Sequence, residues 1–269
     1  MRYQIDHDLH IHTHLSICSS DEGQTPESIL AHAKKSGLRT VCITDHYWDS
    51  AVPCHTGVNW WYEAQNFAHI SQDCPMPKDD EVQVLFGCET DLDSENFVGI
   101  PQERWQDFSF IIVSTTHFHH MCGAAWENPT VEDLARLWVE RFDAVLNANL
   151  PFGKVGIAHL ACGLICMNSR EKYLEVLDLI PATEMERLFA KAAKLGAGIE
   201  LNFSDMSFAD GEAETILRMF RIAKACGCKF YFGSDAHERT AFDGVAGIFE
   251  RAITLLDLQE SDKFIISEK

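Results

Sequence analysis

The sequence predicts an α/β fold in which seven parallel strands close into a distorted, TIM-like (β/α)7 barrel. Short apolar segments alternate with amphipathic ones along the 269 residues, as in a parallel sheet covered by helices. Nearly every predicted strand ends in His, Asp or Glu. The carboxyl ends of barrel strands meet at one mouth, whereas ends at opposite edges of a doubly wound sheet lie too far apart to share ligands. The strand ends therefore favour the barrel.

Composition limits the organisation and the partners. No linker or internal repeat divides the chain, so we expect one domain over residues 1–269 with an irregular insertion at about 47–80. The 41 acidic residues exceed the 22 basic ones and give a net charge of -19. This charge argues against a nucleic-acid polymer or an anionic membrane as partner.

The sequence also indicates a compartment. No apolar stretch approaches the ~20 residues of a membrane span, and the N-terminus lacks the apolar run of a signal peptide. The ten cysteines are scattered and include no C-x-x-C pair, which is typical of free thiols in a reducing cytosol. We expect a cytoplasmic protein and leave its oligomeric state open.

The first strand, at about 5–13, carries a polar face. Asp8, His10 and His12 are two residues apart and should point the same way, while Leu9 and Ile11 point to the other face. A helix should begin at Thr25-Pro26, with Thr as N-cap and Pro at the first helical position, and end at Gly37.

The remaining elements follow from apolar runs and helical periodicity. Strands are expected at 40–44, 82–86, 108–114, 155–158, 198–201 and 229–232. Helices are expected at 131–148, 212–225 and 245–256, helical segments cover 170–195, and a short helix ends near His69. The aromatic insertion is equally consistent with an ordered flap near the site and with a surface loop that packs its own small core.

Eight side chains at the strand ends form a candidate ligand set. Burying such groups without a counter-ion costs several kcal/mol each, and cations remove that cost. Imidazole and carboxylate suit Zn, Fe or Mn rather than Ca or Mg. Eight groups are too many for one tetrahedral ion, so we expect two or three divalent ions, with Glu89 and Asp235 as bridging candidates. The set is His10, His12, His46, Glu89, His117, His159, Asp235 and His237.

These motifs, in this order, resemble the PHP (polymerase and histidinol phosphatase) family. They are Asp-x-His-x-His-Thr, Thr-Asp-His, Gly-x-Glu, a His after the fourth strand, Ala-His and Gly-Ser-Asp-x-His, from Asp8 to His237. The resemblance implies a distorted (β/α)7 barrel and a trinuclear metal centre, held by the eight residues above, that hydrolyses phosphate esters. Some members carry a ninth ligand where this chain has Cys18. Cys18 could be a soft ligand, its ion could be weak or absent, and His14 and Asp21 are less favoured substitutes.

The resulting hypothesis is phosphomonoester hydrolysis of a small phosphorylated substrate. A metal-bridging hydroxide would attack phosphorus in line. Asp235 is assigned to the reacting centre, and His119 is a candidate acid or substrate contact. Arg170 and Arg239 are candidates to bind phosphate, although a surface role is favoured for each. Asp8 is a candidate to orient a ligand histidine from behind.

Alternatives from other classes stay open. Among PHP proteins, the chain length and the His-Phe pair after the fourth strand look most like histidinol phosphatases. A phosphodiesterase or nucleotide phosphatase could use Trp60, Trp61 or Trp126 to stack on a base. A related barrel could hydrolyse an amide or lactone. A metal-binding module without catalysis would be expected to have lost some ligands, and all eight are present.

Overall fold

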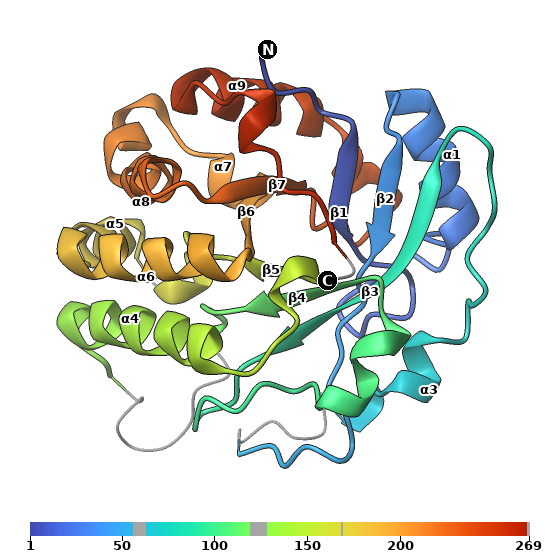
Figure 1. Ribbon diagram of the computed structural model, residues 1–269, viewed down its shortest axis with the longest axis horizontal. Coiled ribbons are helices and arrows are strands. Elements are labelled where there is room, and N and C mark those ends of the chain that lie inside the picture. The colour runs from blue at the N-terminus through green and yellow to red at the C-terminus, as the bar shows by residue number, and fades with distance from the viewer. Residues whose placement is uncertain (56–62, 119–127, 168, 268–269) are drawn as a thin grey trace.

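The computed structural model describes residues 1–55, 63–118, 128–167 and 169–267. Seven parallel strands follow one another around a single sheet in sequence order (Figure 1). This arrangement confirms the predicted barrel. The strands are β1 (His7–Ile11), β2 (Thr40–Ile43), β3 (Gln83–Asp91), β4 (Phe110–Ser114), β5 (Val155–Ala158), β6 (Gly198–Asn202) and β7 (Lys229–Gly233).

The first and last strands close the barrel just beyond β7. The N–H of Asp235 donates to the carbonyl of His10 over 2.7 Å, and the N–H of His12 donates to the carbonyl of Ala236 over 3.0 Å. Ile11 and Ala236 form a parallel bridge between these bonds. The closing contacts therefore involve the two chain segments that carry His10, His12, Asp235 and His237.

Helices cover the outside of the sheet (Figure 1). They are α1 (Pro26–Ser36), α3 (Phe67–Ile70), α4 (Val131–Asn147), α5 (Arg170–Leu179), α6 (Ala182–Leu195), α7 (Phe203–Met206), α8 (Ala213–Ala225) and α9 (Val245–Leu256). Short 3-10 turns lie at Gln102–Asp107, Phe152–Lys154, Gly163–Ile165, Asp210–Glu212, Arg239–Phe242 and Glu260–Asp262. None of the described helices combines the length and apolar character needed to cross a bilayer.

Local sequence signals explain most helix ends. Thr25 caps α1 through the N–H of Ser28, and Gly37 ends that helix with a φ of 72°, as predicted. The helical segments expected over 170–195 are two helices, α5 and α6. Pro181 has no N–H to donate and restricts Ile180 to an extended backbone, so the chain breaks there before α6 begins.

The barrel lumen is apolar in one part and polar in another. Side chains from five strands and the C-terminal segment meet in one buried cluster, which only the lumen permits: Leu9, Cys42, Phe110, Ile112, Ala158, Tyr231 and Phe264. The alternate residues Ile111 and Val113 of β4 belong to the outer core beneath the helices. Nearer the carboxyl ends of the strands, His10, Glu89 and Glu200 are buried.

The predicted facing of the first strand is wrong in one respect. Leu9 lies in the lumen, whereas Ile11 packs against α1 with Ile29 and Ala33. The register of β1 against β2 shifts between Asp8 and Ile11, as a β-bulge causes. Because of this bulge, successive side chains of β1 do not alternate strictly between the lumen and the outer face.

The described part of the insertion contacts the loop that follows β1. The Gln65 side chain accepts from the Ile17 N–H and donates to the Leu15 carbonyl, and His69 Nε2 lies 2.7 Å from the same carbonyl. This part of the insertion therefore lies at the end of the barrel to which β1 leads.

A test of the close-packed lumen is Gly156→Ala. An added Cβ on β5 would collide with the Tyr231 hydroxyl and the Phe110 ring. We expect a loss of ~1–3 kcal/mol in the free energy of unfolding, measured by urea denaturation. The control Gly247→Ala, on an open surface of α9, should be neutral or slightly stabilising. Equal stability of the two variants would contradict this packing.

Candidate metal centre

The barrel brings the eight predicted ligand residues to one end. His10 is in β1 and Glu89 in β3, while the others lie one to four residues beyond the end of a strand. Glu89 lies inside a strand rather than beyond it because β3 continues to Asp91, pairing there with β4. The predicted end of that strand at residue 86 is therefore too early.

Glu89 is the central carboxylate of this group, and its side chain is fully buried. Its Oε2 lies 2.8 Å from His46 Nδ1, 3.4 Å from His12 Nε2 and 3.5 Å from His10 Nε2. Its Oε1 lies 3.1 Å from His159 Nε2 and also accepts from the Ser114 hydroxyl. One carboxylate thus faces four imidazoles from the ends of three strands, β1, β2 and β5.

Asp235 is a second shared carboxylate, at the more open edge of the group. Its Oδ1 lies 3.2 Å from His12 Nε2 and 3.5 Å from His10 Nε2, and its Oδ2 lies 3.7 Å from His159 Nε2. The Asp235 side chain is 20% exposed, in contrast to 0% for His10 and His12. Solvent or a ligand can therefore approach from the Asp235 side.

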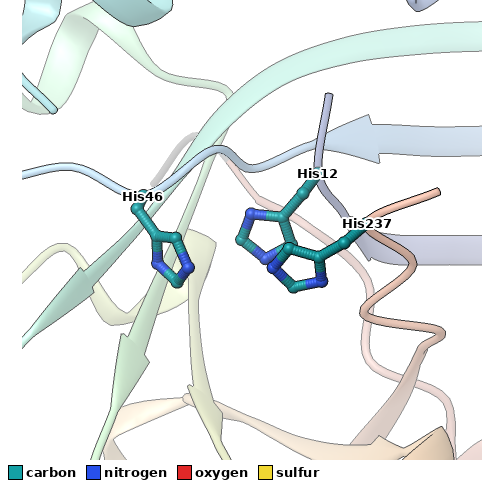
Figure 2. Close-up of side chains that lie close together, drawn as sticks. All are labelled: His12, His46 and His237. Carbon is teal, nitrogen blue, oxygen red and sulfur yellow. The ribbon is translucent and has the colours of Figure 1, made fainter. Parts of the chain in front are cut away.

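Three histidines form a subgroup at this edge. Figure 2 shows the rings of His12 and His237 against each other with His46 beside them. The His12 and His237 ring centroids are 4.0 Å apart, and His46 lies 4.5 Å from His12. The exposed Cys18 lies next to this subgroup, with its Sγ 3.2 Å from His46 Nε2.

The electrostatics of the group favour added positive charge. Burial alone would raise the pKa of Glu89 and of Asp235, but His10 and its neighbours lower both well below their usual range. Burial alone would lower the pKa of His10, but Glu200, Asp235 and Glu89 raise it. The two carboxylates are therefore stable as anions only while positive charge lies between them.

Burial keeps other members of the group neutral. It lowers the pKa of His46, and together with the nearby His12 it lowers the pKa of His237 to about 3. A neutral imidazole is the form that binds a metal ion. The group therefore combines anionic carboxylates with imidazoles held ready as ligands.

Donor atoms converge closely enough to share ions. In each of three sets the donor atoms lie within 4.8 Å of one another: His12, His46 and His237; His10, Glu89 and His159; and His10, His12 and Asp235. A fourth such set joins His159 to Cys162 and Asp205. His117 is in none of these sets; its ring centroid lies 4.8 Å from that of His159. The donor types suit Zn, Mn or Fe.

Outer partners hold several of these imidazoles. His10 Nδ1 lies 2.6 Å from Glu200 Oε1, and His117 Nδ1 lies 2.8 Å from Asp91 Oδ1. His12 Nδ1 lies 2.8 Å from the Ser16 hydroxyl. That hydroxyl donates to Asp45, which also accepts from the N–H and the hydroxyl of Thr13. These partners were not predicted from the sequence, although a Glu inside the apolar strand GIELN is a recognisable signal of a buried polar role.

Two candidate ligands have left-handed backbones. His159 has a φ of 60° and Asp235 a φ of 55°, a region that costs energy for residues other than glycine. Hydrogen bonds hold both: the Thr116 hydroxyl donates to the His159 carbonyl, and Asp235 bonds to His10. These turns aim both side chains back over the barrel mouth.

Other predicted site residues have different neighbours. Asp8 accepts from the N–H groups of Ser234 and His10, so it contacts backbone rather than an imidazole. Arg170 makes two bonds to Glu212, and Arg239 makes two to Asp21.

The other suggested residues divide into two groups. His14 faces Asp73 at 3.7 Å. His119, Trp60, Trp61 and Trp126 lie outside the described residues.

Comparison with known families identifies the class of protein. The model of the PHP domain matches residues 8–204, more than half of the chain. The chain belongs to the PHP domain family. The family predicted from the sequence is thereby confirmed.

Individual relatives agree with this class. The chain is 25% identical to a probable phosphatase of Caldicellulosiruptor saccharolyticus, over 86% of this chain and 82% of that protein. It is 26% identical to a probable phosphatase of a Thermoanaerobacter species, over 92% and 84%. The predicted phosphatase class agrees with both.

A solved structure shares the fold. The histidinol phosphate phosphatase of Lactococcus lactis, complexed with zinc, L-histidinol and phosphate, superimposes with a TM-score of 0.61. It is 15% identical, and the match covers 97% of this chain and 98% of that one.

Cobalt binding can test whether the Cys18 thiolate is a metal ligand. A thiolate bound to Co²⁺ gives an intense charge-transfer band in the near ultraviolet, and Cys is a soft ligand. We expect this band in the Co²⁺-loaded protein and its loss in Cys18→Ser. Cys162→Ser is the matched control and should keep the band. Loss of the band in the control alone would assign the thiolate to Cys162 instead.

Proposed function

We propose that this protein is a metal-dependent phosphomonoesterase that acts on a small phosphorylated metabolite. The observation that carries the proposal is the buried Glu89 carboxylate, which lies within 3.5 Å of imidazole nitrogens of His10, His12, His46 and His159. An arrangement of this kind is costly as a structural core and favourable as a cage for cations.

The eight residues predicted as ligands are the ones we propose to hold two or three divalent ions. Glu89 and Asp235 would be shared between ions, because each faces nitrogens of at least three histidines. Zn, Mn or Fe bound in such a site supplies Lewis acidity that activates water and neutralises phosphoryl oxygens. His117 would complete the set from the end of β4.

The protein side chains would orient the substrate and restrict water. The buried side of the group, at His10 and Glu89, excludes solvent, while Asp235 and His237 are exposed by 20% and 27% of their side chains. A phosphate monoester would enter at this open edge.

Three further residues are proposed to assist. Arg239 follows His237 by two residues and could turn from Asp21 toward a phosphate. Arg170 is the second cationic candidate, and His119 is the proposed acid for the leaving oxygen.

Histidinol phosphate is a specific candidate substrate. The support is the shared fold with the Lactococcus enzyme, whose structure contains L-histidinol and phosphate. The net charge of -19 also favours a small substrate over a nucleic-acid polymer. A phosphodiester, a nucleotide, or an amide or lactone remains the alternative substrate class.

Metal removal tests the proposal directly. We expect the purified protein to hydrolyse p-nitrophenyl phosphate, to lose this activity after dialysis against a chelator, and to recover it with Zn, Mn or Fe. Released phosphate and bound metal should be measured on the same sample. Activity that persists in the metal-free protein would contradict the mechanism.

The role of Glu89 is tested by Glu89→Gln. Loss of the shared negative charge should reduce kcat/KM by at least about 100-fold and lower the bound metal per chain. Glu81→Gln is the matched control, since that side chain is 76% exposed on the segment that precedes β3. Wild-type metal content and turnover in Glu89→Gln would refute the assignment.

A substrate panel separates the alternatives. We expect histidinol phosphate and other small monoesters that carry no nucleobase to be hydrolysed faster than bis(p-nitrophenyl) phosphate, nucleotides or a lactone at equal concentration. Preference for the diester or the lactone would assign the same centre to another reaction.

A further inference from the structure

We propose that Glu200 is a positioning residue that fixes the orientation of His10 and anchors His159 at the metal centre. This inference deepens the proposed function and rests on it. Glu200 belongs to β6, and it is not one of the eight residues predicted as ligands.

Glu200 contacts two candidate ligand residues at once. Its Oε1 accepts from His10 Nδ1 over 2.6 Å, and its Oε2 accepts from the backbone N–H of His159 over 3.1 Å. The Glu200 side chain is 1% exposed and that of His10 is 0% exposed. One buried carboxylate therefore links β6 to residues of β1 and of the turn after β5.

The neighbouring strand leaves space for this carboxylate. Gly233, at the end of β7, lies against Glu200 and His10, and a Cβ there would collide with Glu200 Oε1 and with the His10 Cβ. A side chain at position 233 would displace Glu200 and His10, so their contact requires glycine at this position.

The contact determines which His10 nitrogen faces the centre. With Nδ1 donating to Glu200, Nε2 is directed at the other groups, 3.1 Å from His12 Nε2 and 3.5 Å from both Glu89 Oε2 and Asp235 Oδ1. A hydrogen bond from Nδ1 to a carboxylate fixes the ring tautomer and makes Nε2 a stronger metal donor.

The second contact acts on a strained backbone. His159 has a φ of 60°, and its N–H donates to Glu200 while its carbonyl accepts from Thr116. Removing the acceptor would leave a buried N–H without its partner and release the turn that aims His159 at Glu89.

The test compares metal affinity in Glu200→Gln and in a matched control. The two donors bond to different oxygens of Glu200, and glutamine replaces one of these oxygens with an NH2 group, so it cannot make both contacts in the same position. We expect zinc and manganese to bind 10–100-fold more weakly, as measured by competition with a chromogenic chelator. Asp93→Asn also removes a buried carboxylate, one that caps loop backbone and faces His55, and should bind metal like the wild type.

A second measurement does not depend on the variant folding. Imidazole ¹⁵N NMR of the zinc-loaded wild type should show His10 with a proton on Nδ1 and the metal on Nε2. A His10 ring protonated on Nε2, or bound to zinc through Nδ1, would overturn the inference. So would unchanged metal affinity in a folded Glu200→Gln variant.

The outcomes separate this inference from the proposed function. A wild-type protein that binds no zinc, manganese or iron contradicts the metal-dependent function itself. A wild type that binds metal and is active, with Glu200→Gln indistinguishable from it, contradicts only the role of Glu200.

Discussion

The structure depends on the groups around Glu89 that offset the negative charge of its buried carboxylate. A carboxylate shielded from water is unstable unless positive charge or hydrogen-bond donors surround it. Here four imidazoles from three strand ends and the Ser114 hydroxyl surround it. Protons on those imidazoles can supply the positive charge, but divalent ions can supply more of it and use all the nitrogens together. The same constraint that makes the group costly for folding makes it suitable for binding cations.

Closure of the barrel makes this compensation possible. Asp235 and His237 come from the far end of the sequence, and they reach His10 and His12 only because the turn after β7 bonds to β1. The lumen beneath is filled by apolar side chains such as Phe110 and Tyr231, so the polar groups are confined to the mouth. Glycines at 156 and 233 leave the space that the large lumen side chains and Glu200 occupy. Fold and site are thus determined by the same few positions.

Sequence patterns predicted the strand order and the eight convergent groups, because both follow from local periodicity and from residues at strand ends. These patterns did not predict the features that depend on contacts between residues far apart in the sequence. The bulge in β1, which separates Leu9 from Ile11, depends on pairing with β2. The extension of β3 through Glu89 depends on β4. Glu200 contacts His10 and Asp91 contacts His117, and these pairs are far apart in the sequence. Their neighbours in the sequence therefore do not reveal these contacts.

Anomalous X-ray diffraction from crystals of the purified protein tests the central claim most directly, with data at the zinc, iron and manganese absorption edges. The account predicts two or three anomalous peaks at the barrel mouth, with at least one between Glu89 and the nitrogens of His10 or His159. Strong peaks only elsewhere on the protein, or a well-ordered mouth without an anomalous peak at saturating metal, would contradict it.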